Sequence, residues 1–378
     1  MHPVVVLIFH ATAPHDAGPL VRALAEARHA LAERQRVAFL AAGADVAVIV
    51  AGPPDRISFG ERLTAAIRAR IDVPTKTGGR AASSGAGGMI ILGSGSIPMA
   101  RAADFRRFVE AAAGPGGYAL ANNLYSADVV AVSRAADLLD LPPLPADNAL
   151  PRWLEEHAGV VVTDLRSRWR LGVDIDTPLD LIVLGEPAAR VLHSAAPLLG
   201  ERLGQRLAAL VEVLANRRAE LLVAGRVSTA TLHWLQSGVA CRVRALVEER
   251  GLKAATQLAQ HGATTNSRPP RSVLGELLDR DGPGALAQLV GRLADAAVID
   301  TRVLLAHRHG FAESAWPGAE DRFASDLLAP TEIKDPWLRE LTESAVDSPA
   351  GRPIILGGHT MLNGGLRLLA GRARAGSR

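Results

Sequence analysis

Cysteine, aromatic residues and long apolar runs are the scarcest features of this 378-residue chain. The single cysteine, Cys241, excludes a disulfide within the chain, as expected of a protein in a reducing compartment such as the cytoplasm. Its apolar surroundings are typical of a small buried residue rather than a nucleophile. Only 4% of the residues are Phe, Trp or Tyr, so aliphatic side chains must supply most of the core.

Membrane and nucleic-acid partners are not expected from the composition. No apolar run reaches the length that a membrane span needs, and residues 1–9 lack a basic leader and a small-residue cleavage site. The 42 basic residues nearly balance the 39 acidic ones, so the chain has no global field that would attract nucleic acid. We therefore expect a cytoplasmic protein, and a homo-oligomer is compatible with this composition.

The hydrophobic pattern of the first half alternates between strand and helix. Residues 4–9 form a continuous apolar run of strand length, typical of a strand buried on both faces, and we expect further buried strands at residues 45–50 and 89–92. Helical spacing follows each of these segments, at residues 19–42, 59–69 and 101–113. This alternation predicts an α/β fold with a mostly parallel sheet. The length predicts two domains, and we place them at residues 1–190 and 191–378.

A second strand and helix alternation fills the second half and predicts another α/β domain. Its expected strands lie at residues 221–223, 241–247, 297–306 and 354–356. On the third of these, we expect Arg302 to pair with Asp300 or with a neighbouring acid. The basic, Gly- and Ala-rich tail from Arg367 is expected to be a frayed end rather than an arm for nucleic acid.

Two closely spaced carboxylates mark the middle of the chain. We expect a strand over residues 169–175 that leads into them, with Asp174 and Asp176 on one face and Val173 and Ile175 toward the core. Two carboxylates on one face at a strand end can hold a hard divalent cation such as Mg²⁺. The plainer alternative is that both are solvated.

The residues that follow have the signals of a helix start. Thr177 is a good N-cap, Pro178 suits the first helical position, and Asp180 stands three residues after the cap, as in a capping box. A well-built helix start alone would account for this part of the motif.

The segment Asp-Ile-Asp-Thr-Pro-Leu-Asp-Leu, residues 174–181, resembles the Asp-x-Asp-Thr-Pro-x-Asp-Leu signature of a nucleotidyltransferase domain. Molybdenum-cofactor guanylyltransferases, 2-phospho-lactate guanylyltransferases and related sugar-nucleotide enzymes share this domain. The resemblance covers roughly residues 3–190. It implies a Rossmann-like, nucleotide-diphospho-sugar-transferase (GT-A-like) fold, a nucleotide ligand and Mg²⁺, with Asp174 and Asp176 as the catalytic metal ligands.

Two segments depart from the pattern of that family. The loop after the first strand is Gly-rich and basic in the family and cradles the triphosphate, but here residues 10–16 contain no Gly, Lys or Arg. After the third strand the family usually has a metal-binding Asp, whereas this chain reads Gly93-Ser94-Gly95-Ser96. The glycines still let backbone amides approach a phosphate, although a simple tight turn also explains them.

Further polar residues follow other predicted strands. Asn122, Asn123 and Ser126 can hydrogen-bond a base or ribose, or can form an ordinary turn.

In the second half, the segment Gly357-Gly358-His359-Thr360 offers backbone amides, an imidazole and a hydroxyl at a strand end. With Arg226, which can clamp a carboxylate or phosphate, it forms a candidate anion site.

Three functions remain open from the sequence. The first is a Mg²⁺-dependent nucleotidyltransferase that moves a nucleoside monophosphate from a nucleoside triphosphate to a small phosphorylated or carboxylated acceptor. The second is a nucleotide-binding or assembly protein that keeps this fold without turnover, as the two departures indicate. The third places the chemistry at the anion site of the second domain.

Overall fold

The computed structural model describes residues 2–52, 59–71, 87–142, 144, 149–185, 197–249, 270–310 and 312–376. Over these residues the chain is an α/β protein, as its hydrophobic pattern predicts. None of the helices in the described ranges is both long and apolar enough to cross a membrane. Internal contacts divide the chain into unit 1, which is Met1–Asp16 with Ala25–Asp174, and unit 2, which is Ala17–Leu24 with Ile175–Arg378.

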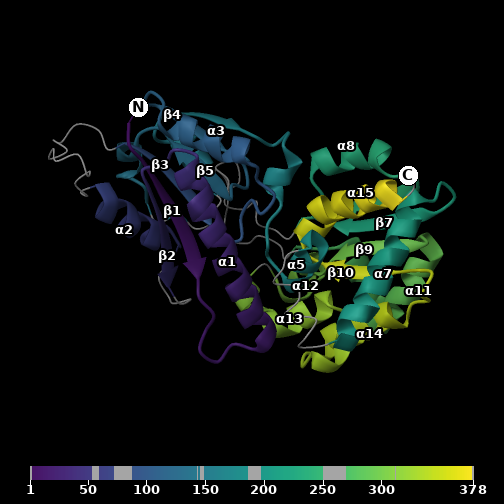
Figure 1. Cartoon of the computed structure of the whole chain (residues 1–378). Helices are drawn as coiled ribbons and strands as arrows, with labels where there is room; N and C mark the ends of the chain where they lie inside the picture. Colours follow the sequence, from purple (N-terminus) through teal and green to yellow (C-terminus); the bar gives the residue numbers. More distant parts are fainter. Residues whose placement is uncertain are drawn as a thin grey trace. The chain divides into compact units, whose positions relative to one another are not determined.

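Unit 1 is built on a six-stranded sheet with the order β2-β1-β3-β5-β4-β6 (Figure 1). Strand β5 runs antiparallel to both of its neighbours, and the remaining pairs are parallel. The strands are β1 (Val4–Ala11), β2 (Val46–Gly52), β3 (Gly88–Gly93), β4 (Tyr118–Ala121), β5 (Val129–Val132) and β6 (Val161–Asp164).

Helices cover both faces of this sheet because its central strands are apolar on both sides. Val6 and Ile8 of β1 pack in one cluster with residues of α1 and α3, whereas Leu7 and Phe9 pack in another with residues of α2 and α4. Successive residues of a strand point to opposite faces, so a continuous apolar run requires two covering layers. The helices are α1 (Pro19–Ala41), α2 (Phe59–Ile71), α3 (Ala102–Ala112) and α4 (Leu150–Glu156).

Unit 2 is built on a four-stranded parallel sheet with the order β10-β9-β7-β8. Its strands are β7 (Glu220–Gly225), β8 (Arg242–Val247), β9 (Ala296–Asp300) and β10 (Ile354–Gly357). The helices of this unit are α5 (Pro178–Leu184), α7 (Pro197–Ala215), α8 (Thr229–Gly238), α10 (Val273–Asp281), α11 (Leu286–Leu293), α12 (Thr301–His309), α13 (Ala319–Asp326), α14 (Pro336–Asp347) and α15 (Leu366–Gly376). Helices α7, α11, α13 and α14 pack against strands of the sheet (Figure 1).

The strand orders locate the place where each sheet can bind a ligand. In unit 1 the chain moves from β1 to β2 on one side and then to β3 on the other, so the direction reverses between β1 and β3. In unit 2 the same reversal falls between β7 and β9. Ligands of open α/β sheets bind outside the carboxyl ends of the strands at such a point.

The strand expected over residues 297–306 is wrong in its second part. Strand β9 ends at Asp300, whose carboxylate caps α12 by accepting a hydrogen bond from the backbone N–H of Arg302. Residues 303–306 are buried on the helix, and a short apolar run buried on all sides has no period that separates helix from strand. The expected pairing of Arg302 is confirmed, because its guanidinium contacts the carboxylate of Asp326.

Two other expectations are corrected. Residues 169–172 form a short 3₁₀ helix instead of a strand, because the backbone N–H of Leu171 bonds the carbonyl of Arg168 within a turn. The basic tail is the helix α15 rather than a frayed end. Arg367, Arg372 and Arg374 of α15 each donate to a backbone carbonyl elsewhere in unit 2.

Candidate functional site

The helix start predicted after the paired carboxylates is confirmed. Thr177 is the N-cap of α5, with extended backbone angles, and Pro178 is the first helical residue. The Oδ2 atom of Asp180 accepts hydrogen bonds from the backbone N–H of Asp176 and Thr177 and from the Thr177 hydroxyl. These local contacts fix the direction in which the chain enters α5.

The two carboxylates of the motif differ in their surroundings. Asp174 is buried and forms an isolated antiparallel bridge with Ser96 in unit 1. Asp176 is exposed, whereas Val173 and Ile175 are buried as predicted. This segment is not a regular strand, because its bridge to Ser96 involves Asp174 alone. Buried and exposed side chains therefore do not alternate strictly along residues 173–176.

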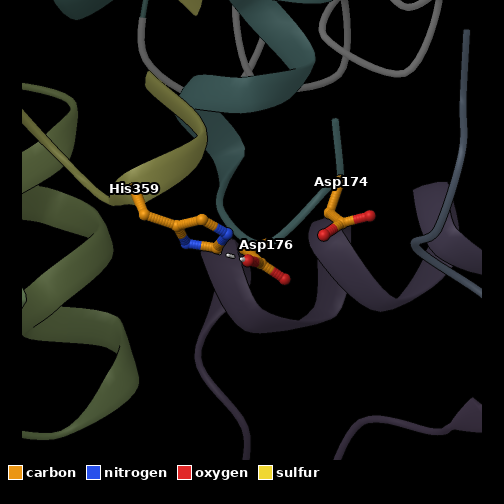
Figure 2. Close-up of side chains that lie close together, drawn as sticks. All are labelled: Asp174, Asp176 and His359. Atoms are coloured by element: carbon orange, nitrogen blue, oxygen red, sulfur yellow. Dashed lines mark ion pairs between the residues drawn. The ribbon is translucent and has the colours of Figure 1, made fainter. Parts of the chain in front are cut away.

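Within unit 2, Asp176 faces the imidazole of His359, and Figure 2 shows the two side chains with Asp174. The Asp176 Oδ2 atom lies 3.8 Å from His359 Nδ1. Both side chains are partly exposed, at 46% and 36% respectively. Asp174 precedes Asp176 by two residues, and two peptide units span at most about 7 Å between Cα atoms. Chain connectivity therefore keeps the Cα atoms of Asp174 and Asp176 within this distance.

The donor set decides which cations fit. Two carboxylates suit Mg²⁺, which prefers oxygen ligands and keeps several waters. An imidazole nitrogen suits zinc, copper, iron and nickel, whereas carboxylates and water suit Mg²⁺ and Mn²⁺. Asp174 and Asp176 thus fit the Mg²⁺ that the resemblance implies, and His359 widens the choice to metals that accept nitrogen.

Asp180 is an ionisable group that the sequence indicated only as a cap. Burial, together with the negative charge of Asp176, raises the pKa of Asp180 to about 7, although its hydrogen bonds from Thr177 and Asp176 act in the opposite direction. The side chain is almost fully buried. The buried carboxyl group of Asp180 thus lies on the same short turn as the exposed carboxyl group of Asp176.

In unit 1, the predicted Gly93–Ser96 segment forms a turn directly after β3. The Ser94 hydroxyl is buried and hydrogen-bonds His10 Nδ1 at 3.1 Å. Gln35 donates to the carbonyl of Ser96. The next residue, Ile97, has φ 45°, which is a strained value for a β-branched residue. These contacts lie at the carboxyl ends of β1 and β3.

The surroundings of His10 favour the neutral form of its imidazole. Burial, followed by the positive charges of His29 and Arg28, lowers the pKa of His10.

The asparagines after β4 have structural roles. Asn122 donates to Asp128 and to the carbonyl of Leu171, and its own side-chain oxygen accepts from the backbone N–H of Asp128. Asn123 accepts from the backbone N–H of Tyr125, as in a turn. These contacts match the turn alternative, and the role of Asn122, Asn123 and Ser126 toward a nucleotide stays a prediction.

The segment predicted to bind an anion in the second half lies at the end of β10. Gly357 ends the strand, and helical structure begins at His359 and Thr360. Arg226 follows β7 and donates two hydrogen bonds to Asp300, from Nε at 2.6 Å and from Nη2 at 3.1 Å. Its guanidinium therefore already holds a carboxylate of the chain itself.

Asn363 is a residue of this region whose role sequence reasoning missed. Its side-chain nitrogen donates to the carbonyls of Arg226 and His359, and its oxygen accepts from the backbone N–H of Ser228. Only the contact with His359, four residues earlier, is local. A pattern in the sequence could not have shown the other two, which span more than 130 residues.

Comparisons with known proteins identify no family for this chain. No protein-family model matches the chain, and no curated protein matches it.

Proposed function

We propose that the chain is a divalent-cation-dependent, nucleotidyltransferase-like protein that transfers a nucleoside monophosphate from a nucleoside triphosphate to a small phosphorylated or carboxylated acceptor. The observation that carries the proposal is the bridge between Ser96 and Asp174. It places the first carboxylate of the motif beside the glycine-containing turn at the carboxyl end of β3. That edge of a parallel sheet is where phosphorylated ligands bind.

The chain's own residues divide the work in this reaction. Asp174 and Asp176 would hold the cation, and within unit 2 the imidazole of His359 stands beside Asp176. In the Gly93–Ser96 turn, the backbone N–H groups of Gly93, Ser94 and Ser96 already donate to carbonyls of the chain, so Gly95 is the residue whose backbone would approach the phosphates. An acceptor oxygen bonds to the α-phosphorus, the bond to the bridging oxygen breaks, and pyrophosphate leaves. When bound, the cation neutralises charge on the phosphates as a Lewis acid.

Pyrophosphate release tests this proposal. The full chain would be incubated with GTP or CTP, with Mg²⁺ or Mn²⁺, and with a panel of small phospho- and carboxy-acids. We expect release by the wild type and a loss of about 100-fold in Asp176→Asn, as for other groups that stabilise transition-state charge. Asp281→Asn, an exposed acid paired with Arg280, is the matched control and should keep the wild-type rate. A wild type that releases no pyrophosphate with any pair contradicts transfer.

A second candidate function is nucleotide binding without turnover. The hydrogen bond between His10 and Ser94 favours it, because it engages the Ser94 hydroxyl at the place where the resembled family usually has a metal-binding Asp. Calorimetric titration with GTP and CTP separates the two functions. Binding without pyrophosphate release would support the second, and release would reject it.

A further inference from the structure

The carboxyl edge of the sheet in unit 2 carries charged side chains that the proposed cation site does not use. The reversal of strand order falls between β7 and β9. Arg226 follows β7 in the chain, and Asp300 is the last residue of β9. A crevice at this place is where open α/β sheets bind ligands.

The guanidinium of Arg226 is oriented by its hydrogen bonds to the carboxylate of Asp300. Asp300 is fully buried, whereas the side chain of Arg226 keeps 17% of its exposure. A guanidinium has five N–H groups, and the two hydrogen bonds to Asp300 use two of them. The remaining N–H groups can donate to an oxyanion, which is the ligand that a fixed guanidinium recognises best.

The same edge includes the start of the last helix. Asn363 ties this helix start to the loop after β7, because its amide contacts the carbonyls of both Arg226 and His359. Asn363 lies in a π-helical turn, Met361–Gly365, a distortion that is frequent at functional sites. Arg226 and His359 are therefore held at one edge by one side chain.

An independent observation comes from Thr360 in the first turn of that helix. The side chain is 4% exposed, and its hydroxyl has no hydrogen-bond partner within the part of the chain that the structure describes. A buried hydroxyl without a partner destabilises the fold, so a ligand oxygen that supplies the partner would recover this loss. The amides at a helix start also favour an anion.

We propose that unit 2 holds an oxyanion site for a phosphate or carboxylate group at the carboxyl ends of β7, β9 and β10. Arg226 is the anion-binding side chain, and Asp300 positions it. Thr360 and the helix start at His359 supply further donors. The site requires no nucleotidyl transfer, so it stands apart from the proposed function.

The charges of the site set the kind of anion that it takes. The guanidiniums of Arg226 and Arg302 contact the carboxylates of Asp300 and Asp326, so the four groups carry no surplus positive charge. A bare anion therefore gains hydrogen bonds but little net attraction. An anion accompanied by a divalent cation is expected to bind more tightly, and this expectation rests on the proposed cation site at Asp176 and His359.

Calorimetric titration of the full chain with inorganic phosphate, and separately with succinate, tests the site in the absence of divalent cations. Arg226→Gln should weaken binding about tenfold or more, because it removes charge-assisted hydrogen bonds. Arg244→Gln is the matched control, since Arg244 lies on β8 of the same sheet and pairs with Glu220. It should bind as the wild type does. Binding of phosphate alone or succinate alone assigns the ligand class.

Additional variants guard against a folding defect. Arg226→Gln leaves Asp300 buried without its guanidinium, so the double variant Arg226→Gln/Asp300→Asn removes both charges, and circular dichroism checks its fold. Asp176→Asn should still bind phosphate, which separates this site from the cation site. The proposal is overturned if the wild type binds neither probe, or if the folded double variant binds as the wild type does.

Discussion

Single buried carboxylates in this chain join segments that lie far apart in the sequence. Asp104 on α3 accepts from the backbone N–H of Arg101, from Arg168 at 2.6 Å and from Arg170 at 3.2 Å. Burial alone would raise the pKa of Asp104, but these donors hold it below its usual value. One side chain thus links α3 to the segment that precedes Asp174.

Replacing Asp104 should destabilise unit 1 and change its response to acid. A carboxyl group whose pKa is lowered by folding stabilises the fold above its unfolded pKa of about 4, and that stability is lost as the pH falls through the lower folded pKa. We expect Asp104→Asn to lower the free energy of unfolding by about 2–4 kcal/mol at pH 7 and to flatten its decline below pH 4. Urea unfolding at a series of pH values measures both. An unchanged acid response would contradict the role given to these donors.

The thiol of Cys241 should be inert in the folded chain. Burial raises the pKa of Cys241 to about 11, and the residue is buried as the sequence predicts. At pH 8 the thiolate population is therefore very small, and we expect slow alkylation by iodoacetamide. Unfolding in urea should restore the ordinary rate of a free thiol. Fast alkylation of the native protein would show that the thiol is exposed.

At the scale of single residues, contacts between neighbours in the sequence were predictable, whereas contacts between distant residues were not. The capping box of Thr177 and Asp180 depends on residues three positions apart, so its signal is visible in the sequence. The two guanidinium partners of Asp104 stand 64 and 66 positions away, and no local pattern specifies them. The same limit hid the contact of Asp176 with His359.

At the scale of the elements, the turn after β7 depends on a glycine. Gly225 has φ 130°, and a Cβ atom there would lie 2.3 Å from the Cβ of Asp300. The close approach brings the loop that carries Arg226 against the end of β9. The apolar runs of β7, β9 and β10 were recognisable in the sequence. The close approach of Gly225 to Asp300 was not, because it depends on the pairing of β7 with β9.

Gly225→Ala should therefore destabilise unit 2 more than a comparable glycine substitution. The positive φ costs about 1–2 kcal/mol, and the overlap with Asp300 adds about 1–3 kcal/mol. Gly282→Ala is the control, because Gly282 has φ 85° but no neighbour within 4 Å of its Cβ position. Chemical unfolding of both variants compares the two costs. Equal losses would show that the approach to Asp300 is not tight.

At the scale of the whole molecule, the chain does not divide at a single point. The first turn of α1 belongs to unit 2, where the backbone N–H groups of Leu20 and Val21 donate to the carboxylate of Glu320. The α/β class was predictable from strand and helix periods. This cap was not, because its two sides are about 300 residues apart.

Removing the charge of Glu320 should weaken the start of α1. A carboxylate near a helix N-terminus satisfies N–H groups and opposes the helix dipole, so Glu320→Gln should cost about 1 kcal/mol. Glu332→Gln changes an exposed acid and should cost less. Thermal unfolding of the two variants provides the comparison, and an equal effect would argue against the cap.

The most direct test of the account is whether the paired carboxylates bind a cation. Titration of the full chain with Mn²⁺, followed by the paramagnetic resonance signal of the free ion, counts the sites and their affinities. The account predicts a site in the wild type and in Asp281→Asn that is lost in Asp176→Asn. Equal Mn²⁺ binding by the wild type and Asp176→Asn would contradict it.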